Sequence, residues 1–99
     1  MSESKRIPMI LCCTPSGRAV LFAEVDKAPE LGGPVIMHNA RMVLRWSAQC
    51  GGLLGLAANG PKGDTKLTAA VDVVGDAVCA QYLTVSETAA EALRRWPAA

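Results

Sequence analysis

The chain has 99 residues, of which 51 % are hydrophobic and 19 % are charged, and ten Lys and Arg against nine Asp and Glu leave a formal net charge of +1. This composition is too apolar for a disordered chain and too short for two ordinary domains, so it predicts one globular domain over residues 1–99. No apolar run reaches the 18 residues that a membrane span needs. The near-neutral charge removes the simplest argument for nucleic acid or an anionic membrane surface as a partner.

Cysteine usage and the start of the chain predict a cytoplasmic protein. The first apolar run, Ile7–Cys13, is short and interrupted by Pro8, unlike the apolar region of a secretory signal peptide. We therefore expect the four cysteines to be reduced thiols rather than two disulfides. These cysteines are Cys12, Cys13, Cys50 and Cys79.

Two apolar segments near the N-terminus predict a β-hairpin. Ile7–Cys13 and Arg18–Val25 are separated by Thr14-Pro15-Ser16-Gly17, a sequence rich in turn-forming residues. Residues 26–34 contain two prolines and two glycines, so we expect a connecting loop there.

The next segment, Val35–Trp46, is predicted as a strand because its side chains alternate in polarity. We expect its apolar face to pack in the core and its charged face to meet water. The apolar face consists of Met42, Leu44 and Trp46, and the charged face of Arg41, Val43 and Arg45. The pair His38-Asn39 interrupts the apolar pattern and indicates a bulge or a turn.

The middle of the chain is predicted as turns around one short strand. Ser47–Gly52 has the composition of a turn, and Asn59–Asp64 is the strongest turn signal in the chain. Between them, Leu53–Ala58 is predicted as an apolar strand. Gly55 within it indicates a close approach of backbone or a bulge.

A second hairpin is predicted after residue 65. Lys66–Val74 alternates in polarity, Gly75-Asp76 has the composition of a two-residue turn, and Ala77–Leu83 is the expected partner strand. The inward residues of the first strand should be Leu67, Ala69, Val71 and Val73.

The last segment is predicted as a helix, because the apolar period changes from two to about 3.6 residues. Thr84 with Glu87 matches a capping box, Ser86 is an alternative N-cap, and Pro97 ends the helix. The stripe expected to pack on the sheet is Val85, Ala89, Leu93 and Trp96. Strands followed by one helix predict an α+β fold, with a small antiparallel sheet of five to six strands, curled or barrel-like forms included, under one C-terminal helix.

Residues that could carry chemistry are sparse. His38 is the one histidine and Cys50-Gly51-Gly52 could present a thiol on a turn, but nothing in the sequence brings the two together. The cysteine and histidine spacing does not match common zinc sites, so no metal and no other cofactor is expected. A basic stripe of Arg41, Arg45 and Lys66 is the remaining speculative binding feature.

Part of the chain resembles a group of short proteins encoded in bacteriophages and prophages, which have no established function. The shared elements are Asn39-Ala40-Arg41-Met42-Val43 (NARMV), Trp46, Gly51-Gly52 and Leu56-Ala57-Ala58-Asn59-Gly60-Pro61 (LAANGP). Thr65–Val71 and the Ala-rich end near Trp96 are similar too, so the resemblance covers roughly the last two thirds of the chain. It implies a phage-related setting in a bacterial host and supplies no catalytic or binding residue.

Three functional hypotheses follow from these observations. The first is a phage-related, non-enzymatic accessory protein that binds another protein or its own copy, because antiparallel sheets expose edges and apolar patches. The second is binding of single-stranded nucleic acid through Arg41, Arg45 and Lys66. The third is a cysteine-dependent enzyme that uses Cys50 and His38.

Overall fold

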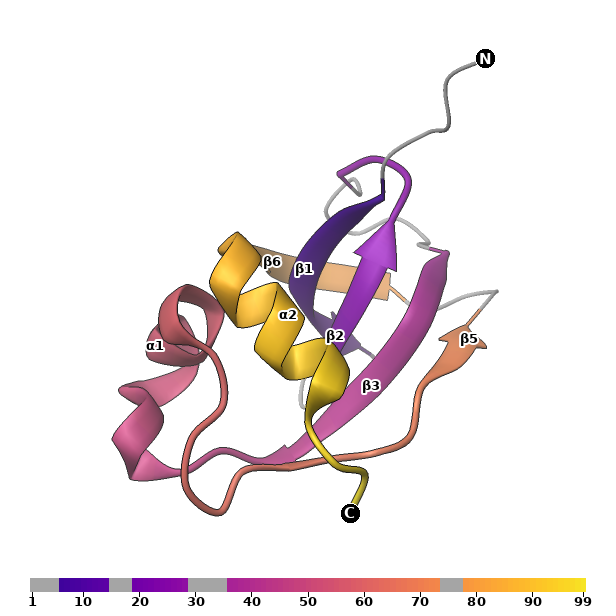
Figure 1. Ribbon diagram of the computed structural model, residues 1–99. Coiled ribbons are helices and arrows are strands. Elements are labelled where there is room, and N and C mark those ends of the chain that lie inside the picture. Colours follow the sequence, from indigo (N-terminus) through magenta and orange to yellow (C-terminus); the bar gives the residue numbers. More distant parts are fainter. Residues whose placement is uncertain (1–5, 15–18, 29–35, 74–77) are drawn as a thin grey trace.

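An antiparallel sheet of six strands carries two helices on one of its faces (Figure 1). The computed structural model describes residues 6–14, 19–28, 36–73 and 78–99. Its strands are β1 (Ile7–Thr14), β2 (Ala19–Val25), β3 (Met37–Arg45), β4 (Lys66–Leu67), β5 (Val71–Val73) and β6 (Val78–Thr84). The strand order is β4-β3-β2-β1-β6, and β5 also pairs with β3. The sheet does not close over the described residues, and the predicted α+β class is confirmed.

The first predicted hairpin is confirmed. β1 and β2 pair in continuous antiparallel register from Ile7 opposite Val25 to Cys13 opposite Ala19. The predicted turn lies mostly outside the described residues.

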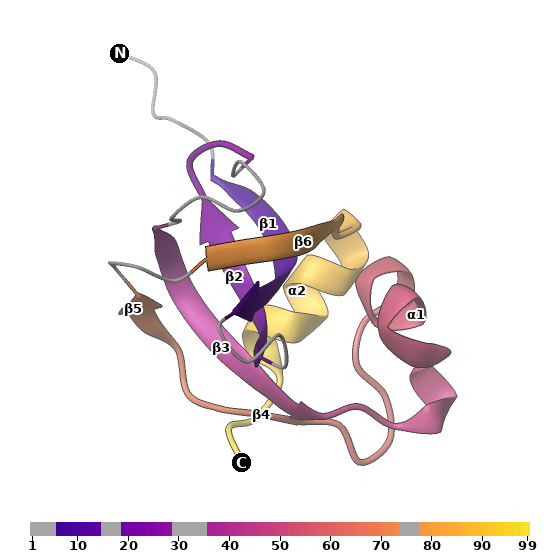
Figure 2. The ribbon, with the colours of Figure 1, turned by 180° about the vertical axis from the view of Figure 1, so that it is seen from behind.

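The second predicted hairpin is wrong in its pairing. Its first strand is split into β4 and β5, which both pair with β3, whereas β6 pairs with β1. Figure 2, seen from behind, shows β6 crossing in front of β1 and β2. β1 is thus a central strand, and both of its faces are buried: Met9 and Leu11 lie in one apolar cluster and Ile10 in another. The turn at Gly75-Asp76 lies outside the described residues.

The segment predicted as the strand Leu53–Ala58 is instead a helix, α1 (Gly52–Asn59), preceded by a short 3₁₀ turn, Ala48–Cys50. Leu and Ala are good helix formers, and a short apolar run gives no periodicity that separates the two structures. Gly51 and Gly60 bound the helix at positive φ, 88° and 90°. The close backbone approach expected at Gly55 is confirmed, because a Cβ there would overlap the carbonyl oxygen of Cys50.

The C-terminal helix, α2 (Glu87–Arg95), forms as predicted. Ser86 rather than Thr84 is the N-cap, and its Oγ accepts a hydrogen bond of 3.1 Å from the Ala89 N–H. The predicted apolar stripe packs into the cluster between the helices and the sheet. In that cluster Ala89 and Leu93 are fully buried, and Val85 and Trp96 are half-buried.

Two apolar clusters lie on opposite faces of the sheet. The helix-side cluster comprises Ile10, Phe22, Val43, Cys50, Leu56, Ala57, Leu67, Ala90 and Leu93. The cluster on the other face comprises Met9, Leu11, Ala23, Val25, Met37 and Ala40. Alternate residues of β1, β2 and β3 therefore contribute to different clusters, which is the period-two pattern of a sheet buried on both faces.

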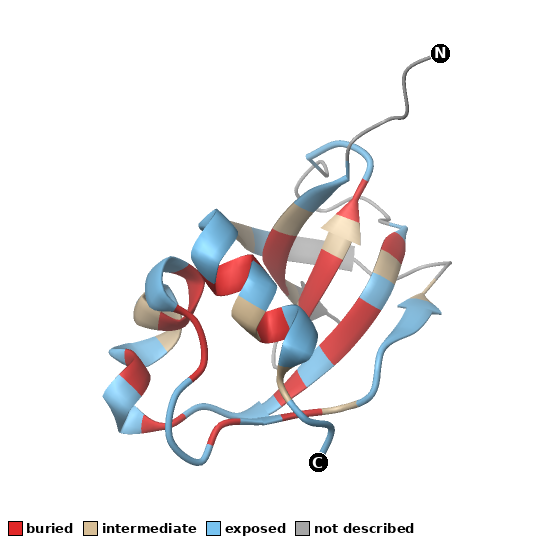
Figure 3. Ribbon diagram, viewed as in Figure 1, coloured by how far each residue is buried: buried red, intermediate tan, exposed pale blue. Residues whose placement is uncertain are grey.

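The faces of β3 are the reverse of the prediction. Buried and exposed residues alternate from Arg41 to Leu44 (Figure 3), and the buried ones there are Arg41, 5 % exposed, and Val43, 6 % exposed. Met42, Leu44 and Trp46, predicted to be core, are 40 %, 55 % and 37 % exposed. The bulge expected near His38-Asn39 is confirmed by interrupted register there and by a φ of 52° at Asn39.

Candidate functional site

Arg41 lies between β3 and the C-terminal end of α2, where it binds backbone carbonyls. Its Nε donates to the Thr68 carbonyl at 2.7 Å, and its Nη1 donates to the Leu93 carbonyl at 2.7 Å and to the Arg94 carbonyl at 3.4 Å. Carbonyls in the last turn of a helix lack partners within the helix, and the helix dipole favours a cation there. Desolvation by burial lowers the pKa of Arg41 from its ordinary value, yet a guanidinium remains charged at neutral pH. Arg41 therefore caps α2.

The predicted basic stripe is not assembled as expected, because Arg41 is buried. Arg45 and Lys66 are exposed and lie opposite each other in the ladder between β3 and β4. Arg45 forms an ion pair with Asp64, with 2.8 Å between Nε and Oδ2. Of the three cations in the predicted stripe, Arg41 is therefore buried and Arg45 is paired with Asp64.

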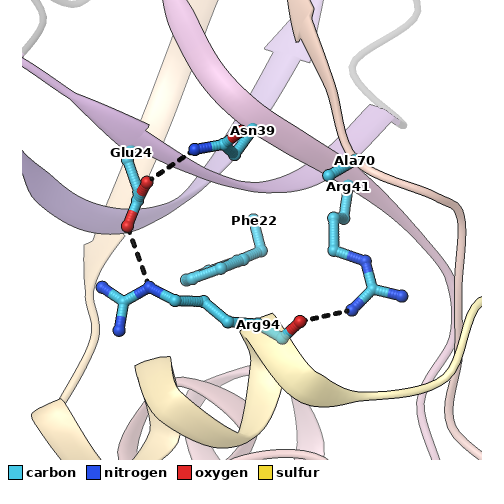
Figure 4. Close-up of a pocket in the computed structure, with 6 residues that line it drawn as sticks. All are labelled: Phe22, Glu24, Asn39, Arg41, Ala70 and Arg94. Atoms are coloured by element: carbon cyan, nitrogen blue, oxygen red, sulfur yellow. Dashed lines mark hydrogen bonds and ion pairs between the residues drawn. The ribbon is translucent and has the colours of Figure 1, made fainter.

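A small cavity lies beside Arg41, over the ring of Phe22 (Figure 4). Its volume is about 200 Å³, below the roughly 300–1,000 Å³ of most ligand pockets. Its lining residues are Phe22, Glu24, Asn39, Arg41, Ala70 and Arg94. Among its lining residues, Glu24 binds Asn39 and Arg94, and Arg41 binds the Arg94 carbonyl, so the cavity belongs to the attachment of α2 to the sheet.

Glu24 is the acidic group of this cavity and links β2 to β3 and α2. It accepts hydrogen bonds from Asn39 Nδ2 at 3.0 Å and from Arg94 Nε at 2.8 Å. Desolvation by itself would raise the pKa of Glu24. The hydrogen bonds from Asn39 and Arg94, with the charges of Arg94 and Arg6, outweigh it and hold the pKa below its ordinary value. Glu24 is therefore ionised at neutral pH and paired within the fold.

His38 and Cys50 lie at different ends of β3. His38 is seven positions from the end of the strand at Arg45, which at about 3.3 Å per residue is roughly 23 Å. His38 Nε2 is 3.2 Å from Asp26 Oδ2, while the Cys50 thiol is buried 3.3 Å from the Thr65 hydroxyl. The structure therefore does not bring the proposed nucleophile and base together.

The predicted free thiols are confirmed where the side chains are described. Cys12 and Cys50 are free, and burial raises the pKa of the Cys12 thiol, which reduces its thiolate fraction. The side chains of Cys13 and Cys79 lie outside what the structure describes. Over the described residues, no three His, Cys, Asp or Glu side chains gather as metal ligands would.

An exposed apolar surface lies on the sheet face opposite the helices. Val71 is opposite Ala40 in the ladder, so both side chains leave the same face, and Met42 and Leu44 follow Ala40 on that face at two-residue intervals. We call Met42, Leu44 and Val71 the open-face patch; they are 40 %, 55 % and 61 % exposed. Leu21, opposite Met42 on β2, is half-buried and joins the patch to the cluster of Met9 and Leu11. The patch is therefore the uncovered continuation of a buried core.

A second hollow, with a mixed polar and apolar lining, lies between α1 and the end of β6. Its volume is about 390 Å³, and its lining includes Leu54, Ala57, Leu83 and Val85. Leu54 is 70 % exposed on α1. Leu54 is therefore an exposed leucine that lies on a different surface from the open-face patch.

The comparisons with known proteins place the chain in a family. A family profile described as a domain of unknown function, DUF6948, matches residues 8–93. The chain belongs to this family. Searches of curated proteins and of solved structures returned no significant match. No helix in the described part of the chain is long and apolar enough to cross a membrane.

The alternation of side chains along β3 indicated part of the open-face patch, although the polarity of those side chains suggested the wrong direction for it. Met42 and Leu44 alternate with Arg41 and Val43, and this alternation correctly placed them on a common face. The direction of that face depends on α2, whose last carbonyls offer Arg41 a buried partner. A strand sequence does not reveal such a distant acceptor.

Proposed function

We propose that this protein is a small non-enzymatic accessory protein that acts by binding a protein surface through the open-face patch. The single observation that carries the proposal is the exposure of Met42, Leu44 and Val71 on one sheet face. The largest exposed apolar patch on a soluble protein is often functional, and this one continues a buried core.

The two alternatives have less support in the geometry. Binding of single-stranded nucleic acid needs Arg41 to be accessible, and its guanidinium is bound to the carbonyls of α2. A cysteine enzyme needs a base within hydrogen-bond reach of the thiol, and His38 is bound to Asp26 instead of Cys50. Protein binding is the function that would use the exposed apolar side chains of the open-face patch.

The setting is part of the proposal. The likeness of NARMV, Trp46, the glycine pair and LAANGP to phage and prophage proteins supports a phage-related role in the cytoplasm of a bacterial host. Such a role fits a short chain that binds other proteins, and the family's description as a domain of unknown function names neither a role nor a partner.

Site-specific photocrosslinking in living bacterial cells tests the proposal. A photoreactive amino acid placed at Leu44 should give a discrete crosslinked species, because that side chain is 55 % exposed within the patch. The matched control is the same amino acid at Leu54, which is 70 % exposed on α1. Crosslinks at position 44 that disappear when Met42→Glu is added support the proposal. Equal or absent crosslinking at positions 44 and 54 contradicts it.

A further inference from the structure

We propose that Cys13 and Cys79 form a reversible disulfide under oxidising conditions, and that this bond locks β6 onto β1. The inference goes beyond the proposed function, because it concerns neither the open-face patch nor a partner. It is carried by the register of the ladder between β1 and β6, in which the two cysteines are directly opposite each other.

An irregularity of this ladder brings the two cysteines opposite each other. The pairing of β1 with β6 is regular up to Cys12, which is opposite Gln81, and an unchanged register would place Ala80 opposite Cys13. The register shifts between Cys12 and Cys13, so that Cys79 takes that position instead. The shift thus converts a diagonal relation between the two cysteines into a direct one.

The backbone spacing of such a pair suits a disulfide. Directly opposite residues of an antiparallel pair have Cα atoms about 4.5 or 5.5 Å apart, depending on whether they exchange hydrogen bonds. Both separations fall within the roughly 4.4–6.8 Å that disulfides span. Residues that are directly opposite also lie on the same face of the sheet. A bond between positions 13 and 79 therefore requires no change in strand pairing.

The two remaining cysteines are not placed to compete for this bond. Cys12 is opposite a valine in β2 and a glutamine in β6, so it has no cysteine across either ladder. Burial raises the pKa of the Cys12 thiol, which lowers the fraction of thiolate that can attack a disulfide. Cys50 is buried in the helix-side cluster. Cys13 and Cys79 are therefore the pair that the fold favours.

The oxidant is a small-molecule disulfide such as glutathione disulfide. The thiolate of one cysteine attacks a sulfur of glutathione disulfide, which forms a mixed disulfide and releases one glutathione. The thiolate of the second cysteine then attacks the cysteine sulfur of the mixed disulfide, which forms the protein disulfide and releases the second glutathione. The two protons lost by the cysteines pass to the two glutathione thiolates. The protein loses two electrons, and glutathione disulfide gains them.

The bond acts on the end of the sheet from which α2 follows. β6 is the last strand in the strand order and joins the sheet through β1, and α2 begins at Glu87, shortly after β6 ends at Thr84. The chain between the two cysteines contains β2 to β5 and α1, so the bond closes a long loop and restricts the unfolded chain strongly. Cytoplasmic disulfides are usually transient and redox-sensing, which agrees with reduced thiols in the resting state.

Oxidation of the full chain by excess glutathione disulfide, followed by intact mass measurement and peptide mapping, tests the proposal. We expect the wild-type chain to lose the mass of two hydrogens, with fragment spectra that place the bond between positions 13 and 79. Cys12→Ser, the matched change at the neighbouring position, should form the same bond. Cys13→Ser and Cys79→Ser should instead carry glutathione on the thiol that remains. The oxidised wild-type chain should melt about 10–20 °C above the reduced chain, and dithiothreitol should abolish the difference.

Circular dichroism of each reduced variant checks that it folds, and the fragment spectra of the wild-type chain decide the connectivity where a variant does not fold. A wild-type chain that carries only glutathione adducts or keeps its four thiols overturns the inference. A bond that uses Cys12 or Cys50, or one that joins two chains, overturns it too. An oxidised chain that melts no higher than the reduced chain refutes the locking of β6.

Discussion

Replacing Arg41 with methionine should destabilise the fold far more than its place in an alternating strand suggests. Methionine keeps most of the apolar stem but removes every donor of the guanidinium. The change leaves the Thr68 and Leu93 carbonyls, each now bound at 2.7 Å, without their partner. It also removes the cation that faces the C-terminal end of α2.

The expected loss can be worked out from these contacts. Hydrogen bonds to charged groups contribute about 1.5–3 kcal/mol each, and Arg41 makes two short ones. Water that reaches the freed carbonyls recovers part of this, so we expect a loss of about 3–5 kcal/mol. For a domain of this size that corresponds to a fall in the melting temperature of about 15–30 °C. Arg41→Lys keeps the charge but not the planar fork, and should lose about half as much.

Urea denaturation followed by circular dichroism measures this effect, with Arg45→Met as the matched control. Arg45 is on the same strand and makes one short ion pair with Asp64, but the two side chains are 62 % and 53 % exposed. Such exposed pairs contribute less than about 1 kcal/mol. Equal losses in Arg41→Met and Arg45→Met would refute the argument that Arg41 caps α2. If Arg41→Met does not fold, the comparison of Arg41→Lys with Arg45→Lys serves the same purpose.

Three further predictions concern α1, α2 and the link between β2 and its neighbours. Gly55→Ala should destabilise by about 3 kcal/mol in urea denaturation, although alanine favours helices, because its Cβ would overlap the Cys50 carbonyl; a neutral or stabilising effect would contradict this contact. Ser86→Ala should cost about 1 kcal/mol or more by removing the N-cap of α2 and the hydrogen bond to the Ala58 carbonyl, and Ser86→Asp should restore the cap alone, because a carboxylate cannot donate to that carbonyl. Because folding lowers the pKa of Glu24, its contribution to stability is present above the ordinary glutamate pKa of about 4.3 and is lost as pH falls through the lower folded pKa. Glu24→Gln should therefore flatten the acid limb of the curve of unfolding free energy against pH, and an unchanged limb would be evidence against the pairing.

Patterns among residues close in sequence predicted the secondary-structure elements better than they predicted which strands pair. The N-terminal hairpin and the cap and stripe of α2 depend on residues close in sequence, and they are confirmed. The pairing of β6 with β1 joins segments that lie far apart in the sequence, so no local pattern indicates it. The α1 segment was wrongly predicted as a strand because a six-residue apolar run is too short to show a period that separates strand from helix.

The candidate site was predicted in part. Alternation correctly grouped Met42 with Leu44, but the rule that apolar faces point inward gave the wrong direction. That rule compares the transfer free energies of side chains and does not consider the hydrogen-bond partners that a side chain finds on the buried face. Here the buried face offers Arg41 unpaired helix carbonyls, and their satisfaction offsets the cost of taking its charge out of water.

The bulge at Asn39 connects this reversal to the proposed function. In an uninterrupted strand, Met37 would share a face with Arg41 and Val43, and the even-numbered residues would face the helices. The extra residue in the ladder shifts this parity, so Met37 and Ala40 lie in the same cluster. Arg41 then faces α2, where the helix needs a cation, and the residues that follow Ala40 on the other face are left without cover. The capped helix and the open-face patch are thus two consequences of one backbone irregularity.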